Sequence, residues 1–284
     1  MKLSIGSAQF GFRYGICNKI GIVKKQEVKK IINYCKIKKI NSIDTAQGYG
    51  NSHKILGSLN LNKFKITTKI SNIKKKKIND LESFVNLEVD KILKELNKKK
   101  VYALLIHDVS QLRGKFGKKL YKVLQNLKKN KKIIKLGISV YTKKELDFIL
   151  KNYNIDIVNL PVSVANQEFC KKNYLLKLKK KNIEIHVRSI FLQGLLLSNY
   201  KYLPKRFKNN KFFLEWFNWL KINNYNSLEA SLGFIKDIKY IKKIIIGVDS
   251  YYQLKMIVKA YKKSIKFNFK KFSQSSILRT PSKW

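Results

Sequence analysis

The stretch Ile43-Asp44-Thr45-Ala46-Gln47-Gly48-Tyr49-Gly50 follows an apolar run that begins at Ile37. An apolar run that ends on a carboxylate and enters a turn bracketed by glycines is typical of a buried strand leading into a loop. Two later apolar runs also end on an ionisable residue, one on Lys69 and the other on His107. Packing does not explain consecutive strands that end on Asp, Lys and His beside a loop tyrosine. The pattern therefore predicts one assembled site.

Strand-like and helix-like segments alternate along the whole chain. Apolar strands are expected at 3–9, 40–44, 64–69, 101–107, 133–138, 155–160, 183–188 and 243–247. Helical spacing of apolar residues is expected at 26–37, 51–58, 80–97, 116–129, 143–151, 169–181, 227–238 and 251–261. This alternation predicts an α/β protein with a parallel sheet, and eight units in 284 residues predict a closed (β/α)8 TIM barrel. An open doubly wound sheet would normally carry Gly-x-Gly-x-x-Gly after its first strand, and residues 6–11 do not fit that pattern.

The alternation has no break rich in Pro, Gly or Ser, so we expect one barrel domain over residues 1–265. Residues 266–284 are interpreted as a polar C-terminal tail that either folds over a barrel mouth or is disordered. A longer insertion at 190–224 contains Trp216 and Trp219. These aromatic rings either line a substrate pocket or pack a helix, and the second interpretation is favoured.

The formal net charge is +45, from 62 Lys and Arg against 17 Asp and Glu. Only five of the basic residues are arginine, which is the better residue for bidentate recognition of phosphates and bases. The lysines are spread between apolar positions, and Ile, Asn, Tyr and Phe, which share A/T-rich codons, are also plentiful. We interpret the charge mainly as a compositional property of solvent-exposed faces. Binding to nucleic acid or to an anionic surface stays open as an alternative.

The three cysteines, Cys17, Cys35 and Cys170, form no Cys-x-x-Cys pair and have no histidine cluster near them. A disulfide scaffold and a structural zinc site are therefore not expected. The sequence starts without a basic segment followed by an apolar run, and no stretch approaches the ~18–20 apolar residues of a membrane span. We expect a cytoplasmic protein with three free thiols and no membrane span.

A series of short motifs occurs in order over residues 3–258. They are Gly6-x-Ala8-Gln9-Phe10-Gly11, Asp44-Thr45-Ala46-x-x-Tyr49-Gly50, Leu56-Gly57, Thr68-Lys69, Ile106-His107-Asp108, Leu136-Gly137-Ile138-Ser139, Arg188-Ser189-x-x-x-Gln193-Gly194-Leu195-Leu196 and Ile246-Gly247-x-x-x-x-x-Gln253-Leu254. Together they resemble the aldo/keto reductase family. The sequences of residues 139–141 and 188–194 are similar to those in the branch of the family that is often found among carbohydrate-biosynthesis genes.

The resemblance implies an NAD(P)H-dependent oxidoreductase that reduces an aldehyde, a ketone or a sugar-derived carbonyl to an alcohol. Tyr49 would donate the proton, Lys69 would tune it, Asp44 would pair with Lys69, and His107 would bind the substrate oxygen. The residue types suit this chemistry, because a phenol with a pKa of about 10 is a poor acid that a neighbouring ammonium improves. No metal is needed.

The resemblance also implies a dinucleotide site with these residues: Ser139, Asn159, Arg188, Ser189, Gln193, Gly194, Leu195, Gly247, Ser250 and Gln253. Arg188 stands where many members stack a tyrosine on the nicotinamide, and Asn159 stands where a glutamine is usual. The family usually prefers NADPH over NADH. Gln253 replaces the common arginine near the adenosine phosphate, which leaves NAD open as well.

Two alternatives to a reductase remain. One is a cofactor-binding regulatory barrel without turnover, and the other is a basic binder of nucleic acid or of an anionic surface. The second lacks any recognisable nucleic-acid motif, so no specific nucleic-acid partner is expected. The expected partner is a small-molecule carbonyl substrate. Substrate identity depends on the loops of a barrel, and neither it nor the oligomeric state follows from the sequence.

Overall fold

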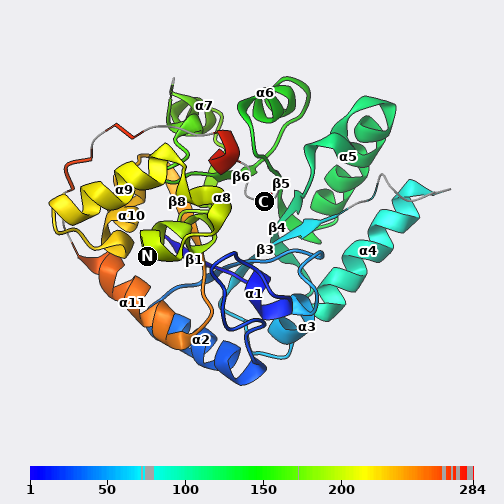
Figure 1. Cartoon of the computed structure of the whole chain (residues 1–284). Helices are drawn as coiled ribbons and strands as arrows, with labels where there is room; N and C mark the ends of the chain where they lie inside the picture. Colours follow the sequence, from blue (N-terminus) through cyan, green and yellow to red (C-terminus); the bar gives the residue numbers. More distant parts are fainter. Residues whose placement is uncertain are drawn as a thin grey trace.

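The computed structural model of the chain describes residues 1–71, 73, 80–171, 173–263, 267–269, 271–272, 276–279 and 284. Within them, parallel strands pair in chain order and close into a barrel, because β8 also pairs with β1 (Figure 1). The strands are β1 (Leu3–Gly6), β2 (Ser42–Asp44), β3 (Lys65–Ile70), β4 (Val101–Ile106), β5 (Ile133–Ser139), β6 (Ile157–Pro161), β7 (Glu184–Arg188) and β8 (Ile241–Gly247). The predicted (β/α)8 barrel of the α/β class is confirmed.

Helices surround the strands and connect them (Figure 1). The α-helices are α1 (Ala8–Gly11), α2 (Lys25–Ile37), α3 (Ser52–Gly57), α4 (Leu81–Glu95), α5 (Gly114–Lys129), α6 (Lys143–Asn152), α7 (Tyr174–Lys180), α8 (Lys205–Lys208), α9 (Lys211–Ile222), α10 (Ser227–Lys236) and α11 (Tyr251–Lys262). Short 3₁₀ helices are η2 (Val109–Leu112), η3 (Glu168–Cys170), η4 (Leu192–Leu197), η5 (Tyr200–Tyr202) and η6 (Ser276–Arg279). Side-chain caps define several starts. Thr142 and Glu145 form a capping box at α6, and Asp80 accepts bonds from the first turn of α4.

Three parts of the chain differ most from the sequence-based expectation. The first strand ends at Gly6 and not at Gln9, because the short helix α1 begins at Ala8. The helix expected at 169–181 divides into η3 and α7, with Asn173 between them in the left-handed conformation at φ 57°. The insertion at 190–224 contains helical structure of its own, namely η4, η5, α8 and α9.

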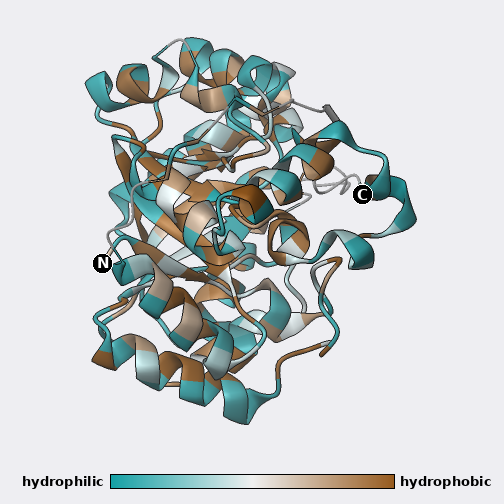
Figure 2. Cartoon of the chain, turned by 60° about the vertical axis from the view of Figure 1, so that its left-hand side comes forward, coloured by the Kyte–Doolittle hydropathy of each residue, from teal (hydrophilic) through white to brown (hydrophobic). Residues whose placement is uncertain are grey.

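Hydrophobic residues gather in the strands and on the helix faces that turn toward them, coloured brown in Figure 2. A second buried cluster surrounds α9, where Trp216 is fully buried and its Nε1 donates to the carbonyl oxygen of Leu196 at 3.1 Å. The rings of Trp216 and Trp219 stack with their centroids 5.4 Å apart. Helix packing therefore accounts for both tryptophans, and neither is among the residues that line the cavity described below.

The described residues of the C-terminal tail pack on this second cluster. Phe272 and Leu278 are buried in it, and the ring of Trp284 lies 5.1 Å from the ring of Phe207 on α8. The predicted boundary between residues 265 and 266 lies outside the described residues. Among the described residues, no helix combines the length and apolar composition that a membrane crossing needs.

Candidate active site

The loop that carries Tyr49 is fixed by two glycines. Gly11, at the end of α1, lies so close to the loop that a Cβ on it would sit 1.7 Å from the carbonyl oxygen of Tyr49. Gly50 has a φ of +51°, a conformation that L side chains rarely adopt, and its own position faces the carbonyl of Gly11. The two glycines thus allow close contact between the backbone at the end of α1 and the backbone of the loop after β2. This contact fixes the position of the Tyr49 backbone.

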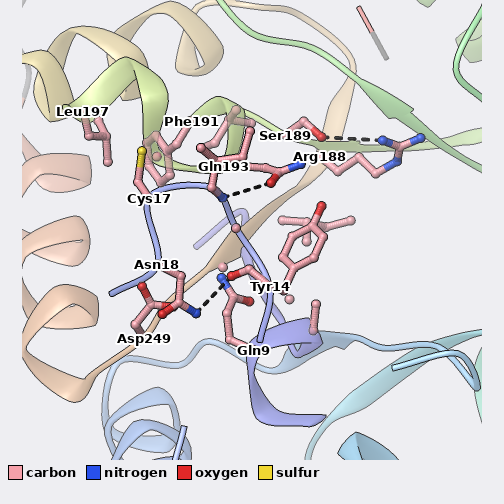
Figure 3. A pocket seen from close by; sticks show the side chains of 18 of the residues that line it. Gln9, Tyr14, Cys17, Asn18, Arg188, Ser189, Phe191, Gln193, Leu197 and Asp249 are labelled. Atoms are coloured by element: carbon pink, nitrogen blue, oxygen red, sulfur yellow. Dashed lines mark hydrogen bonds between the residues drawn. The ribbon is translucent and has the colours of Figure 1, made fainter. Parts of the chain in front are cut away.

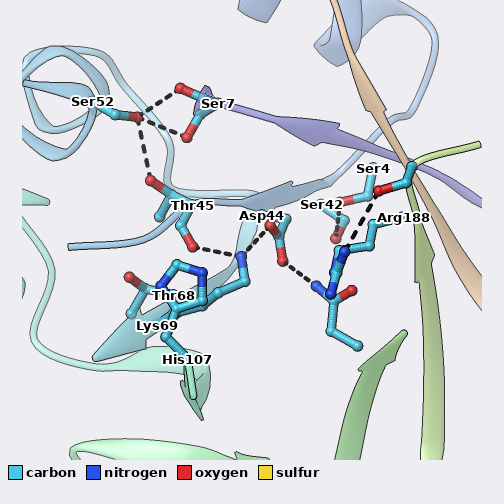
Figure 4. A network of polar contacts seen from close by, with 12 residues as sticks. Ser4, Ser7, Ser42, Asp44, Thr45, Ser52, Thr68, Lys69, His107 and Arg188 are labelled. Carbon is cyan, nitrogen blue, oxygen red and sulfur yellow. Dashed lines mark hydrogen bonds and ion pairs between the residues drawn. The ribbon is translucent and has the colours of Figure 1, made fainter. Parts of the chain in front are cut away.

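Asp44 and Lys69 form an ion pair inside the barrel, with Asp44 at the end of β2 and Lys69 in β3 (Figure 4). Lys69 is 1% exposed and Asp44 is 4% exposed. The ammonium donates to Asp44 Oδ1 and to the carbonyl oxygen of Thr45, the latter at 3.0 Å. Asp44 Oδ2 accepts a hydrogen bond from Asn159 Nδ2 at 3.0 Å. Both carboxylate oxygens therefore have partners, as a buried charge requires.

Tyr49 and His107 lie beside this pair. Lys69 Nζ is 5.2 Å from the centroid of the Tyr49 ring, and the rings of Tyr49 and His107 meet edge to face with centroids 6.2 Å apart. Nδ1 of His107 is 3.1 Å from Ser71 Oγ, so Nε2 is the ring nitrogen available to a ligand. All four predicted catalytic residues thus come together from β2, β3, the end of β4 and the loop after β2.

Burial dominates the protonation of Tyr49. It raises the pKa of the phenol above the usual 10.0, and the Asp44 carboxylate raises it further, whereas the Arg188 guanidinium acts in the opposite direction. Burial and the Asp44 carboxylate thus outweigh the shift toward the phenolate that the sequence led us to expect from Lys69. Tyr49 therefore holds its proton at neutral pH.

The site residues line a cavity of about 630 Å³ at the C-terminal ends of the strands (Figure 3). The cavity is lined by Asp44, Tyr49, Lys69 and His107 together with seven of the ten predicted cofactor residues: Ser139, Arg188, Ser189, Gln193, Gly194, Gly247 and Gln253. Its volume falls within the range of roughly 300–1,000 Å³ that small-molecule and cofactor sites occupy. The strand ends of a barrel thus deliver one continuous site from distant parts of the chain.

The other three predicted cofactor residues do not line the cavity. Asn159 is fully buried and gives its amide to Asp44. Leu195 is fully buried in the cluster around α9. Ser250 is the N-cap of α11, where its hydroxyl accepts from the backbone N–H of Gln253. Their contact with a cofactor stays a prediction.

Several lining residues were not predicted from the sequence to belong to the site. Tyr14 lies in the glycine loop after α1, and burial and the neighbouring Tyr49 raise its pKa to about 12. Tyr141 follows β5 and lies beneath the guanidinium of Arg188. Asp249 follows β8, and burial raises the pKa of its carboxyl group. All three stand in loops, and the sequence pointed to them only indirectly, through the motif glycine Gly11 before Tyr14 and the motif at residues 139–141. Within the described ranges, no three His, Cys, Asp or Glu side chains are grouped as metal ligands.

The sequence model of the aldo/keto reductase family matches residues 2–275. The chain therefore belongs to the aldo/keto reductase family, and the enzyme class is that of NAD(P)-dependent oxidoreductases. The resemblance drawn from the motifs is confirmed at the level of the family.

Solved structures agree on the fold. The chain is similar to the aldo-keto reductase AKR11C1 from Bacillus halodurans in its holo form, with 16% identity over 99% of this chain and 91% of that one and a TM-score of 0.70. It is similar to the glycerol dehydrogenase AKR11B4 from Gluconobacter oxydans, with 19% identity over 93% of this chain and 88% of that one and a TM-score of 0.69. It is also similar to a putative aldo-keto reductase from Pseudomonas aeruginosa, with 18% identity over 92% of this chain and 89% of that one and a TM-score of 0.67. No curated protein matches the chain significantly.

We expect the imidazole of His107 to be uncharged at neutral pH. Burial, followed by the charges of Lys69 and Arg188, lowers its pKa from 6.5 to about 4. The unfolded chain binds this proton near pH 6.5 and the folded chain only near pH 4. Protonation between these values therefore favours unfolding, and the free energy of unfolding falls as the pH drops through that window.

Imidazole ¹⁵N NMR between pH 3 and 8 measures this pKa directly, with the His107→Gln variant assigning the signal. The Lys69→Met variant should shift the pKa of His107 upward, because one of the cations that lower it is gone. A pKa of His107 near 6.5 in the native chain would contradict this account of the site.

Proposed function

We propose that the chain reduces a carbonyl compound to the corresponding alcohol with a nicotinamide dinucleotide, and that Tyr49 donates the proton. The observation that carries the proposal is the meeting of Tyr49, Lys69 and His107 in one cavity beside the buried Asp44–Lys69 pair. The substrate class is an aldehyde, a ketone or a sugar-derived carbonyl, as the family resemblance implies.

The residues of the chain act on the carbonyl oxygen. A reduced nicotinamide in the cavity would supply the hydride for the carbonyl carbon. His107 Nε2 donates a hydrogen bond to the oxygen, because a neutral imidazole with Nδ1 facing Ser71 can carry its proton on Nε2. As the C=O π bond breaks and the oxygen becomes an alkoxide, the phenolic proton of Tyr49 passes to it. An alkoxide is a stronger base than a phenolate, so this transfer is favourable even from a phenol with a raised pKa.

The phenolate that remains needs a cation close by. Lys69 Nζ is 5.2 Å from the ring centroid, and Asp44 with Thr45 fixes the ammonium there. The ammonium attracts a negatively charged phenolate more strongly than a neutral phenol, so its effect develops as Tyr49 loses its proton. This differential stabilisation is what lowers a barrier.

The residues present fit a dinucleotide. Ser139, with its hydroxyl, and Gln193, with its amide, line the cavity. Gly194 has a φ of +93°, and a Cβ on it would lie only 2.7 Å from the Cβ of Cys17, so a larger residue would not fit there. By the resemblance, Ser139 would bind the carboxamide, and Gln193 with Gly194 would follow the pyrophosphate. Asp249 has a buried oxygen, Oδ1, without a hydrogen-bond partner among the described residues. A carboxylate oxygen of this kind suits the ribose hydroxyl of NADH.

The two alternatives are less well supported. A regulatory barrel that only binds the cofactor does not need a buried ion pair beneath a phenol, which costs desolvation free energy. A basic binder of nucleic acid would be expected to gather arginines on one face, and the chain has five arginines in all. One of them, Arg188, faces the cavity.

We expect Tyr49→Phe to lose carbonyl reduction by about 10²–10⁴-fold while it still binds nucleotide, because only the transferable proton is removed. Single-turnover reduction of a panel of aldehydes measures the first effect, and quenching or enhancement of NADH and NADPH fluorescence measures the second. The control is Tyr240→Phe, at an exposed tyrosine outside the cavity. Equal rates for Tyr49→Phe and the native chain would show that another group donates the proton.

The Asp249 carboxylate should also discriminate between the two nucleotides. Asp249→Asn removes a negative charge that repels the 2′-phosphate of NADPH, so the ratio of the dissociation constants for NADPH and NADH should fall by about tenfold. Fluorescence titration with both nucleotides gives this ratio. Asp90→Asn, at an exposed ion pair with Lys132, is the matched control. An unchanged ratio in Asp249→Asn would remove Asp249 from the cofactor site.

A further inference from the structure

Arg188, the last residue of β7, has hydrogen-bond donors to spare. Its Nη2 donates to the carbonyl oxygen of Val140 at 3.1 Å. Its Nη1 lies 3.5 Å from Ser189 Oγ, a contact drawn in Figure 3. A guanidinium has five N–H donors and no acceptor. Among the described residues these two contacts are the hydrogen bonds of the group, which leaves three N–H donors without a protein acceptor.

The orientation of the guanidinium is also fixed. Its Cζ lies 4.1 Å from the centroid of the Tyr141 ring, a stacking distance. The stacking and the bond to Val140 fix the plane of the group, so few rotamers are lost when it binds a ligand. Val140 and Tyr141 both follow β5, which lies two strands from β7 in the barrel. Arg188 is thus a rigid planar donor on the wall of the catalytic cavity.

The charge of Arg188 has no acidic partner within the part of the chain that the structure describes. None of the ion pairs among the described residues includes it. The neighbouring cation Lys69 differs, because Asp44 pairs with it directly. The guanidinium nevertheless acts at the reacting end of the cavity: burial, then Lys69, then Arg188 lower the pKa of His107. An unpaired cation therefore faces the place where the carbonyl is expected.

A nicotinamide ring does not supply the missing anion, since it is neutral when reduced and cationic when oxidised. We propose that Arg188 binds a carboxylate or phosphate group of the substrate, so that the enzyme prefers anionic carbonyl compounds; this inference rests on the proposed reduction. A carboxylate and a phosphate both offer two oxygens that match the planar N–H pair of a guanidinium. The substrate class is thus an aldehyde or ketone that carries such a group.

The test compares carbonyl compounds that differ in one charged group. The phosphate pair is glyceraldehyde 3-phosphate and glyceraldehyde, and the carboxylate pair is succinic semialdehyde and butanal. We expect kcat/KM to be at least tenfold higher for the charged member of one pair, and the pair that responds identifies the group. In Arg188→Gln the ratio of charged to neutral kcat/KM should fall by about 10–100-fold, as expected when a charge-assisted hydrogen bond is lost.

Two further variants separate the charge from other effects of the substitution. Arg188→Lys keeps the charge and loses the planar fork, so it should recover part of the ratio. Arg113→Gln removes an arginine that is likewise stacked on a ring, with its Cζ 4.4 Å from the centroid of Phe148, but that lies outside the cavity. Its ratio should equal that of the native chain. A native ratio near one for both pairs, or a ratio that Arg188→Gln leaves unchanged, would overturn the inference while the proposed reduction stands.

A binding measurement covers the case in which no aldehyde is reduced and the proposed function fails. Calorimetric titration of the native chain compares glycerol 3-phosphate with glycerol, and succinate with butane-1,4-diol, in the presence of NAD⁺. Binding of one anion at least tenfold tighter than its neutral counterpart, lost in Arg188→Gln, would support the anion site on its own. Equal binding of charged and neutral compounds would reject it.

Discussion

The arrangement of the site depends on one buried ion pair, between the Lys69 ammonium and the Asp44 carboxylate. Removing both charges from water costs free energy that their mutual attraction offsets only with further hydrogen bonds. Those bonds come from the carbonyl of Thr45 and the amide of Asn159. Burial, and after it the charge of the Asp44 carboxylate, raises the pKa of Tyr49 and keeps the phenol protonated. The ammonium nevertheless remains beside the ring, where a phenolate would need it.

The barrel makes this pairing geometrically simple. β2 and β3 are adjacent parallel strands, and Asp44 is in register with Thr67, two residues before Lys69. Side chains two apart on a strand share a face, so Lys69 points into the barrel and reaches back to the end of β2. Asn159 lies on β6, across the barrel, and its amide donates a hydrogen bond to the second oxygen of the Asp44 carboxylate. The interior of the barrel thus fixes the charges, and the glycine contact between α1 and the loop after β2 holds the phenol beside them.

Local patterns were sufficient for the strands and for the four residues expected to act together. Apolar runs and helical spacing predicted the barrel. The ends of the strands and the family motifs predicted that Tyr49, Lys69, Asp44 and His107 share one site, and all four line the same cavity. Contacts across the barrel did not follow from the sequence. Asn159 was expected at the cofactor, which stays a prediction, and its hydrogen bond to Asp44, 115 positions earlier in the chain, was not foreseen. The stacking of Arg188 on Tyr141 and the approach of Tyr14 to Tyr49 likewise depend on how distant loops meet, which spacing along the chain does not encode.

The most direct test of the central claim is a double-mutant cycle between Tyr49 and the ion pair. Single-turnover reduction of one good aldehyde is measured for the native chain, Tyr49→Phe, the charge-balanced variant Lys69→Met/Asp44→Asn, and all three substitutions together. If the pair acts through the phenol, the triple variant should be no more than about threefold slower than Tyr49→Phe, because the losses of residues that act as a unit do not multiply. Losses that multiply fully would mean that Lys69 and Asp44 act independently of Tyr49, and the account would be wrong.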